Sequence, residues 1–154
     1  MKRTKVVLLT LFALFLIIQL IRPVRNESGQ APETDMSNIY QMPENVRGIF
    51  KKACYDCHSD HTEYPWYADV QPMGWWLADH IREGKEELNF NRFGTYSIRK
   101  QKSKLKSIAG SLADNSMPLP SYTLIHKNAR LSLEEKKLLL DWLTKTRDSI
   151  SLNK

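Results

Sequence analysis

The sequence is poor in cysteine, with only Cys54 and Cys57 among its 154 residues. It also lacks internal repeats, low-complexity tracts and segments with the apolar–polar alternation of β-strands. Because no other cysteine is present, no other pairing competes for these two thiols, and none near the N-terminus is available for lipidation. The missing strand alternation predicts an all-α chain.

A large excess of charge of one sign is missing from most of the chain. The formal net charge is +6, but residues 1–29 hold five of the basic residues and a single acid, Glu27. Residues 30–154 carry 18 basic and 16 acidic residues, a net charge of +2. Nucleic-acid binding usually requires a clustered basic surface, so we expect no nucleic-acid partner.

The two cysteines belong to the sequence Cys54-Tyr55-Asp56-Cys57-His58, the C-x-x-C-H attachment signature of a c-type haem. Thiols three residues apart lie on one helical turn, so each can add to one of the two vinyl groups of the porphyrin. The adjacent His58 then offers a ring nitrogen to the iron. The motif predicts haem c, attached covalently through Cys54 and Cys57, with His58 as the proximal ligand.

Three other uses of the cysteine pair remain open. A redox disulfide is typical of a βαβ context, which the sequence does not show. A zinc site would combine Cys54 and Cys57 with His58 and His61, although structural zinc sites usually bring a second Cys/His pair of similar spacing. A structural disulfide would close a short, strained loop.

The N-terminus is typical of an export signal. Lys2, Arg3 and Lys5 precede an apolar run over residues 6–21. This run is intermediate in length between a signal-peptide core and a membrane span, and no small-x-small cleavage site clearly follows it. We expect residues 1–21 to form an N-terminal hydrophobic helix that anchors the chain in the bacterial inner membrane by a single span, with the rest in the periplasm. Secretion after signal cleavage is the alternative.

The rest of the chain divides into a linker and one domain. Prolines, glycine and polar residues over residues 22–42 are typical of a linker, and residues 43–154 suffice for one small domain. Helical periodicity predicts a first helix from Glu44 into the haem motif and a second from Met73 to near Leu88. Two more are predicted over residues 96–112 and from Ser132 onward, the last opened by a capping box with Glu135.

A second ligand is needed on the other face of the iron. Met117 lies in the non-helical sequence Met117-Pro118-Leu119-Pro120, and a thioether suits the iron of an electron-transfer haem. A core methionine is the alternative. His80, on the apolar face of the second predicted helix, is the other candidate ligand, and it would otherwise bond to a haem propionate.

Aromatic and backbone groups are expected to complete the pocket. Trp66 and Tyr67 follow the haem motif in a loop, and we expect them to line the haem pocket. The Nδ1 of His58 needs an acceptor to orient the ring, and we expect a backbone carbonyl near Pro65 or Pro72 to supply it.

Several short motifs together resemble a known family. They are Ala53-Cys54-Tyr55-Asp56-Cys57-His58-Ser59 with Tyr64-Pro65-Trp66-Tyr67, then Asp79-His80-Ile81-Arg82-Glu83-Gly84, Leu88-Asn89-Phe90, Lys100-Gln101-Lys102, Met117-Pro118-Leu119-Pro120-Ser121-Tyr122 and Leu140-Asp141-Trp142. In this order they resemble the small haem-binding domain family of exported bacterial, Bacteroidetes-like proteins, over roughly residues 43–145. The resemblance implies a cytochrome c-like helical domain around one covalent haem, held by Cys54, Cys57 and His58 with Met117 as the distal ligand. The sequence Ala113-Asp114-Asn115-Ser116 departs from the acidic run and glycine that the family tends to have there.

The function expected from these features is that of an electron carrier rather than an enzyme. A mono-haem c-type protein outside the cytoplasm would exchange electrons with a redox partner protein. The stretch over residues 89–113 has six basic residues and no acid, so it could dock an acidic partner, although a solvated helix face is an equally good interpretation. The alternative function is a haem-based enzyme or a gas or redox sensor with a labile distal ligand.

Overall fold

The computed structural model describes residues 2–29 and 31–152 and contains helices but no strand within these ranges. Met1, Gln30 of the predicted linker and the last two residues of the predicted domain lie outside the described residues. The longer helices are α1 (Lys2–Ile18), α3 (Glu44–Ala53), α5 (Met73–Glu87), α6 (Ile98–Ala113) and α8 (Leu133–Leu152). The shorter elements are α2 (Met36–Ile39), α4 (Tyr55–His58), η1 (Trp66–Asp69), η2 (Phe90–Thr95), α7 (Pro120–Ile125) and η3 (Lys127–Ala129). The expectation of an all-α fold is confirmed.

The helix boundaries follow local capping chemistry. The Ser97 hydroxyl accepts a hydrogen bond from the backbone N–H of Lys100 and opens α6. At α8 the expected capping box is present, because Ser132 Oγ accepts from the N–H of Glu135 at 3.1 Å while Glu135 Oε2 accepts from the N–H of Ser132 at 3.0 Å. Each of the four predicted helices is found within two residues of its expected start.

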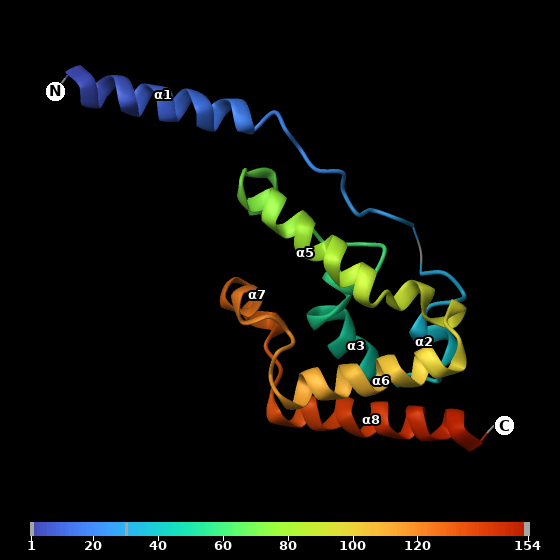
Figure 1. The fold of residues 1–154 in the computed structure, drawn as a ribbon. Helices are drawn as coiled ribbons and strands as arrows, with labels where there is room; N and C mark the ends of the chain where they lie inside the picture. Colours follow the sequence, from blue (N-terminus) through green and yellow to red (C-terminus); the bar gives the residue numbers. More distant parts are fainter. Residues whose placement is uncertain (1, 30, 153–154) are drawn as a thin grey trace.

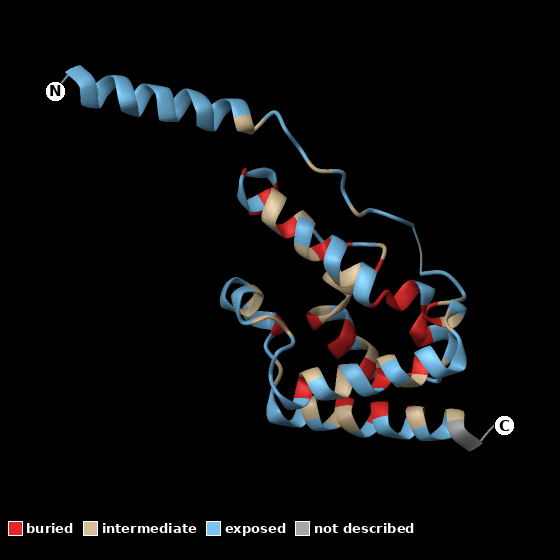
Figure 2. Cartoon of the chain, viewed as in Figure 1, coloured by how far each residue is buried: buried red, intermediate tan, exposed pale blue. Residues whose placement is uncertain are grey.

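The main core lies where α3 meets the pair formed by α6 and α8. These last two helices lie side by side along one edge of the molecule (Figure 1), and the buried residues gather between them and α3 (Figure 2). Phe50 packs edge-to-face against both Phe90 and Trp142, with ring centroids 5.5 and 5.8 Å apart. α3 therefore carries the cysteine motif directly on the main core.

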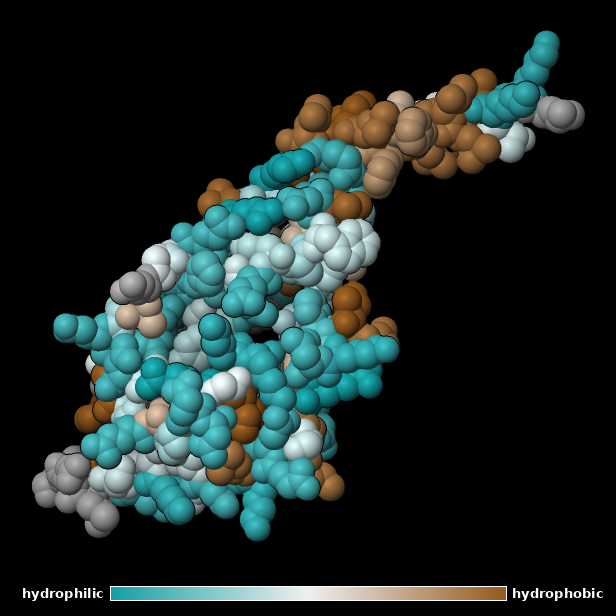
Figure 3. Space-filling view, turned by 180° about the vertical axis from the view of Figure 1, so that it is seen from behind, coloured by the Kyte–Doolittle hydropathy of each residue, from teal (hydrophilic) through white to brown (hydrophobic). Residues whose placement is uncertain are grey.

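The α1 helix projects away from the rest of the molecule (Figure 1), and its apolar side chains form the largest hydrophobic area in Figure 3. It has 17 residues, and its first turn contains basic side chains. Within residues 2–29 and 31–152, no helix combines the length and the apolar character needed to cross a membrane. The expected single N-terminal membrane span is therefore wrong. At about 1.5 Å per residue, the apolar part of α1 is shorter than the roughly 30 Å of a hydrocarbon core.

The segment that follows α1 runs along the domain. We call residues 22–29 the strap. The backbone of Asn26 donates to the Tyr64 hydroxyl at 2.7 Å and accepts from the N–H of Thr62 at 2.9 Å. Ser28 donates from its backbone N–H to the carbonyl of Asp60 at 2.9 Å. This part of the predicted linker is thus hydrogen-bonded to the residues that directly follow the cysteine motif.

Candidate functional site

The cysteine motif forms a single tight turn at the end of α3. The helix stops at Cys54, whose φ of −131° leaves the helical region, and α4 carries the rest of the motif. The backbone N–H groups of Cys57 and His58 both donate to the carbonyl of Cys54, at 3.2 and 3.0 Å. Both cysteines are free and half-buried. The turn therefore presents two thiols and an imidazole from five consecutive residues.

Burial changes the chemistry of the two thiols. Desolvation raises the pKa of Cys54 to about 12, with a further contribution from the neighbouring Cys57. It also raises the pKa of Cys57 to about 11, with a contribution from the Asp56 carboxylate. Both groups are therefore neutral thiols at neutral pH in the chain alone.

The ring of His58 is oriented by two backbone carbonyls at the end of α5. Its Nδ1 lies 2.8 Å from the carbonyl oxygen of Gly84 and 3.0 Å from that of Leu88. Carbonyl oxygens only accept, so Nδ1 carries the proton and Nε2 keeps a free lone pair. The acceptor expected near Pro65 or Pro72 is therefore wrong. The role is filled by α5, because this helix crosses directly over the turn.

A glycine makes this close crossing possible. A Cβ atom placed on Gly84 would lie only 2.7 Å from the carbonyl oxygen of Cys57. Side-chain carbon atoms do not approach backbone oxygens so closely, so only glycine lets α5 pack against the motif here. Gly84 is part of a predicted helix, and a glycine inside a helical pattern was the available signal for a close approach.

The thiols and the imidazole open onto a cavity with two adjoining lobes, of about 260 and 310 Å³. We call it the motif cavity. Both lobes are lined by Ala53, Cys54, His58, Glu87, Met117 and Pro118. The first lobe extends toward α6 and is lined further by Leu88, Phe90, Lys104, Ser107, Ile108, Ser111 and Leu112. The second extends along α5 and is lined further by Asp56, Cys57, His80, Glu83, Gly84, Leu119 and Tyr122.

The structure brings five of the seven expected site residues to this cavity. Cys54, Cys57, His58, Met117 and His80 all line it. Met117 is 37% exposed and lies in the segment between α6 and α7. Its backbone N–H donates to the carbonyl of Ser111 at 3.2 Å, which ties it to the last turn of α6. Met117 therefore reaches the motif cavity from a segment that is distant from the cysteine motif in sequence.

His80 lies one turn before Gly84 on α5. Its Nδ1 lies 2.9 Å from the carbonyl oxygen of Trp76, so this contact does not involve Nε2. Its ring also packs against the indole of Trp76, with centroids 4.3 Å apart. Because His80 lines the same lobe as Met117, the structure keeps both expected candidates for the distal position within one cavity.

The other two expected residues are not brought to the cavity. Trp66 is 81% exposed, and Tyr67 is buried with its hydroxyl 2.8 Å from Nε2 of His126. Neither is among the described residues that line either lobe. Both lie on η1, which packs against α5, and Tyr67 belongs to a small buried cluster with Ala68 and Leu77 against which Cys57 packs.

Sequence reasoning missed several residues of the cavity wall. Phe90 stacks on Tyr55 at 4.9 Å and meets the His58 ring edge-on at 5.9 Å. Glu87 bonds to Lys104 at 2.8 Å across the mouth between α5 and α6. The hydrogen bond from Lys104 lowers the pKa of Glu87. These contacts join residues that are distant in sequence, so no local sequence pattern predicts them.

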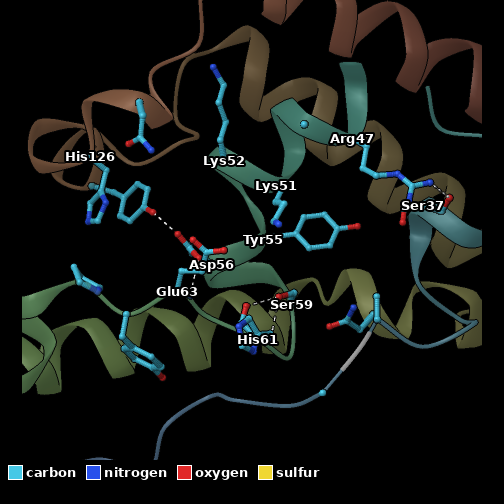
Figure 4. A pocket seen from close by; sticks show the side chains of 18 residues that line it. Ser37, Arg47, Lys51, Lys52, Tyr55, Asp56, Ser59, His61, Glu63 and His126 are labelled. Atoms are coloured by element: carbon cyan, nitrogen blue, oxygen red, sulfur yellow. Dashed lines mark hydrogen bonds between the residues drawn. The ribbon is translucent and has the colours of Figure 1, made fainter. Parts of the chain in front are cut away.

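A larger cleft of about 770 Å³ lies beside the motif cavity, and Figure 4 shows it from close by. We call it the side cleft. Arg47, Lys51 and Lys52 of α3 lie along one wall, and His126 lies across from them. Asp56 and Tyr122 line both the side cleft and the motif cavity. These two residues therefore form a partition between the two spaces.

The residues of the motif cavity fit a haem. The donor set comprises one imidazole nitrogen with a fixed tautomer, one thioether and two unpaired thiols, and the remaining wall is largely aliphatic and aromatic. Within the described part of the chain, no three His, Cys, Asp or Glu side chains cluster as they would to hold a bare metal ion. The zinc alternative therefore finds no ligand cluster here.

Comparison with known proteins agrees with this fit. No curated protein and no solved structure matches the chain. A family model described as a haem-binding domain matches residues 13–145, from within α1 to within α8. The match covers most of the 154 residues, so the chain belongs to the haem-binding domain family.

Proposed function

We propose that this haem-binding protein is a mono-haem, c-type cytochrome-like electron carrier that works outside the cytoplasm. The observation that carries the proposal is the position of His58. Its Nδ1 is fixed by Gly84 and Leu88, so its Nε2 is free in a cavity that also holds both cysteines and Met117.

In this proposal the thiols of Cys54 and Cys57 would hold a haem by adding to its two vinyl groups, and His58 and Met117 would supply the nitrogen and sulfur ligands of its iron. A bound haem would supply reversible one-electron chemistry at iron, and the chain would set the reduction potential through ligands, burial and hydrogen bonds. The two backbone carbonyls accept hydrogen bonds from the Nδ1–H of His58 and so fix the orientation of its ring. A location outside the cytoplasm rests on the basic, then apolar, N-terminal sequence and on the covalent attachment, which takes place there in bacteria.

The test is a spectrum of the full chain produced with the haem-attachment machinery, in both redox states. We expect haem to survive denaturing electrophoresis in the wild type and to be lost in Cys54→Ala/Cys57→Ala. The oxidised protein should show the methionine–iron charge-transfer band, and Met117→Ala should remove it while His80→Ala keeps it. Haem that washes out on denaturation, or a band that survives Met117→Ala, would contradict the proposal.

One observation favours a second candidate, a haem-based sensor or enzyme with a labile distal ligand. Met117 is 37% exposed, and α7, which follows it, has no buried residue. A ligand on so lightly packed a segment can leave the iron. Rapid carbon monoxide binding by the reduced wild type, at the rate seen for Met117→Ala, would support this candidate over the carrier.

A further inference from the structure

The segment that carries Met117 has little packing of its own. We call residues 115–126 the methionine segment. None of the residues of α7 within it is buried, and Leu124 and Ile125 are 70% and 51% exposed. Its chain ends are tied to neighbouring elements, since Lys136 bonds to Asn115 and Arg130 donates to the carbonyl of Thr123 at 3.0 Å. These contacts lie beside the segment and not across the motif cavity.

Two side-chain contacts join the methionine segment to elements that precede it in the sequence. The hydroxyl of Tyr122 donates to Oδ2 of Asp56 at 2.7 Å, and Nε2 of His126 lies 2.8 Å from the Tyr67 hydroxyl. The rings of Tyr122 and His126 stack in parallel at 4.1 Å. In Figure 4, Asp56 and His126 lie on facing walls, and a dashed line marks the bond that reaches Asp56.

Asp56 is a well-anchored acceptor within the cysteine motif. Its carboxylate also accepts from the backbone N–H of Glu63 at 3.0 Å, and its carbonyl accepts from the Thr62 hydroxyl at 2.6 Å. It lies between Cys54 and Cys57, so a bond to its side chain is a bond to the attachment turn itself. Burial, together with the Asp56 bond, raises the pKa of the Tyr122 hydroxyl above its usual value. The hydroxyl therefore remains a donor at all physiological pH values.

We propose that Tyr122 is a positioning residue for the distal ligand. Its bond to Asp56 closes the methionine segment onto the attachment turn and so holds Met117 within reach of the iron. The proposal rests on the proposed function, in which Met117 is the distal ligand. Without the bond, the contact between His126 and the Tyr67 hydroxyl remains as the second tie, but the segment opens more often. Both the motif cavity and the side cleft then gain access to solvent where Asp56 and Tyr122 separate them.

The test compares Tyr122→Phe with Tyr40→Phe in the haem-loaded full chain. Tyr122→Phe keeps the ring and removes only the hydroxyl. Tyr40 is a matched control, because its hydroxyl bonds to Gln101 and it packs on the main core. A hydrogen bond to a carboxylate typically shifts a closing equilibrium by about tenfold. We expect carbon monoxide to bind the reduced Tyr122→Phe about tenfold faster, with a weaker methionine–iron band in the oxidised form, and Tyr40→Phe to match the wild type.

Hydrogen exchange of the α7 amides gives a readout that does not depend on iron. It should be faster in Tyr122→Phe, also in the chain without haem. Faster exchange with an unchanged carbon monoxide rate would overturn the positioning role, and so would unchanged exchange. Asp56→Asn is the second variant, and the double variant should behave like Tyr122→Phe alone if the two residues act through one bond. Failure of the proposed function is recognised separately, because Met117→Ala would then leave the wild-type band in place.

Discussion

The Nδ1 of His58 lies 2.8 Å from the carbonyl oxygen of Gly84, and this contact joins the cysteine motif to a helix that begins 15 residues later in the sequence. The same glycine leaves room for the carbonyl of Cys57, which a Cβ atom would approach to 2.7 Å. One residue thus both orients the proposed proximal ligand and allows the helix to pack on the cysteine motif.

Gly84→Ala should therefore damage the site as well as the fold. The new methyl group meets backbone, which cannot rotate away, so α5 must shift and take the carbonyls at Gly84 and Leu88 with it. We expect a loss of about 1–3 kcal/mol in the free energy of unfolding and a lower yield of haem-loaded protein. Denaturant unfolding and the ratio of haem to protein absorbance measure the two effects.

Gly110→Ala is the matched control for that substitution. Gly110 lies inside α6, is exposed, and has open space where a Cβ would lie. Alanine should stabilise the protein by about 0.5–1 kcal/mol, because it lowers the backbone entropy lost on folding. Equal effects of the two substitutions would show that the close approach at Gly84 has no importance.

A second pair of variants separates the site from the core. Phe90 and Phe93 are both fully buried on η2, but Phe90 contacts Tyr55 and His58 while Phe93 contacts Tyr40 and Tyr96. Replacing either by leucine should cost about 1–3 kcal/mol of stability. Visible absorbance and haem retention should change in Phe90→Leu alone. A comparable spectral change in Phe93→Leu would mean that core packing in general controls the site.

The fold could be predicted largely from sequence because its signals are local. The apolar face of α3 and the capping box of Ser132 and Glu135 depend on residues three or four apart, and both are present as expected. The turn of the cysteine motif depends on local signals as well, since its residues are consecutive. What the sequence could not give is which helix crosses the turn, because the partners of His58 are backbone atoms that leave no residue signature.

The position of Trp66, which was expected in the pocket, and that of Tyr122, which was not, have the same physical explanation. Trp66 follows the motif closely in sequence, yet η1 turns it toward solvent, where it is 81% exposed. Tyr122, which lines the cavity, lies 66 residues from the Asp56 that it bonds. Nearness along the chain was a poor guide to nearness around the cavity, because the cavity is assembled from α3, α5, α6 and the methionine segment.

The ion pair between Lys52 of α3 and Glu135 of α8 predicts that stability depends on pH. Lys52 Nζ lies 2.6 Å from Oε1 of Glu135, and this bond, helped by the N–H of Ser132, lowers the pKa of Glu135 below its ordinary value of 4.5. A carboxyl whose pKa is lower in the folded chain contributes stability above its unfolded pKa. That contribution is lost as the pH falls through the folded pKa.

Glu135→Gln should remove this part of the acid dependence. We expect it to be less stable than the wild type at pH 7 by less than about 1 kcal/mol, because the pair is partly exposed, and the difference should shrink below pH 4.5. Glu134→Gln removes a carboxylate from the same first turn and leaves the Lys52 contact, so it should not reproduce the effect. Parallel stability curves for wild type and Glu135→Gln from pH 7 to pH 3 would contradict the assignment.

The basic face of α6 provides the last prediction, which concerns the proposed redox partner. Lys104 is engaged with Glu87 at the cavity mouth, and Lys100 lies over the Tyr96 ring at 4.0 Å. Arg99 and Lys106 are exposed and lie two turns apart on one face of α6, the helix from which Lys104 and Ser107 line the cavity. If this face attracts anionic partners, the double reversal Arg99→Glu/Lys106→Glu should slow reduction of the haem-loaded protein by ascorbate several-fold at low salt. The rates should converge as salt screens the charges.

The control keeps the change in net charge and moves it to another helix. Lys137 and Lys145 are exposed on α8, which lies beside α6 but contributes no described residue to the wall of the motif cavity. Lys137→Glu/Lys145→Glu should slow the reaction much less, because among the described residues α6 lines the motif cavity and α8 does not. Equal slowing by the two double variants would mean that net charge alone governs the encounter, and α6 would then be an ordinary solvated helix.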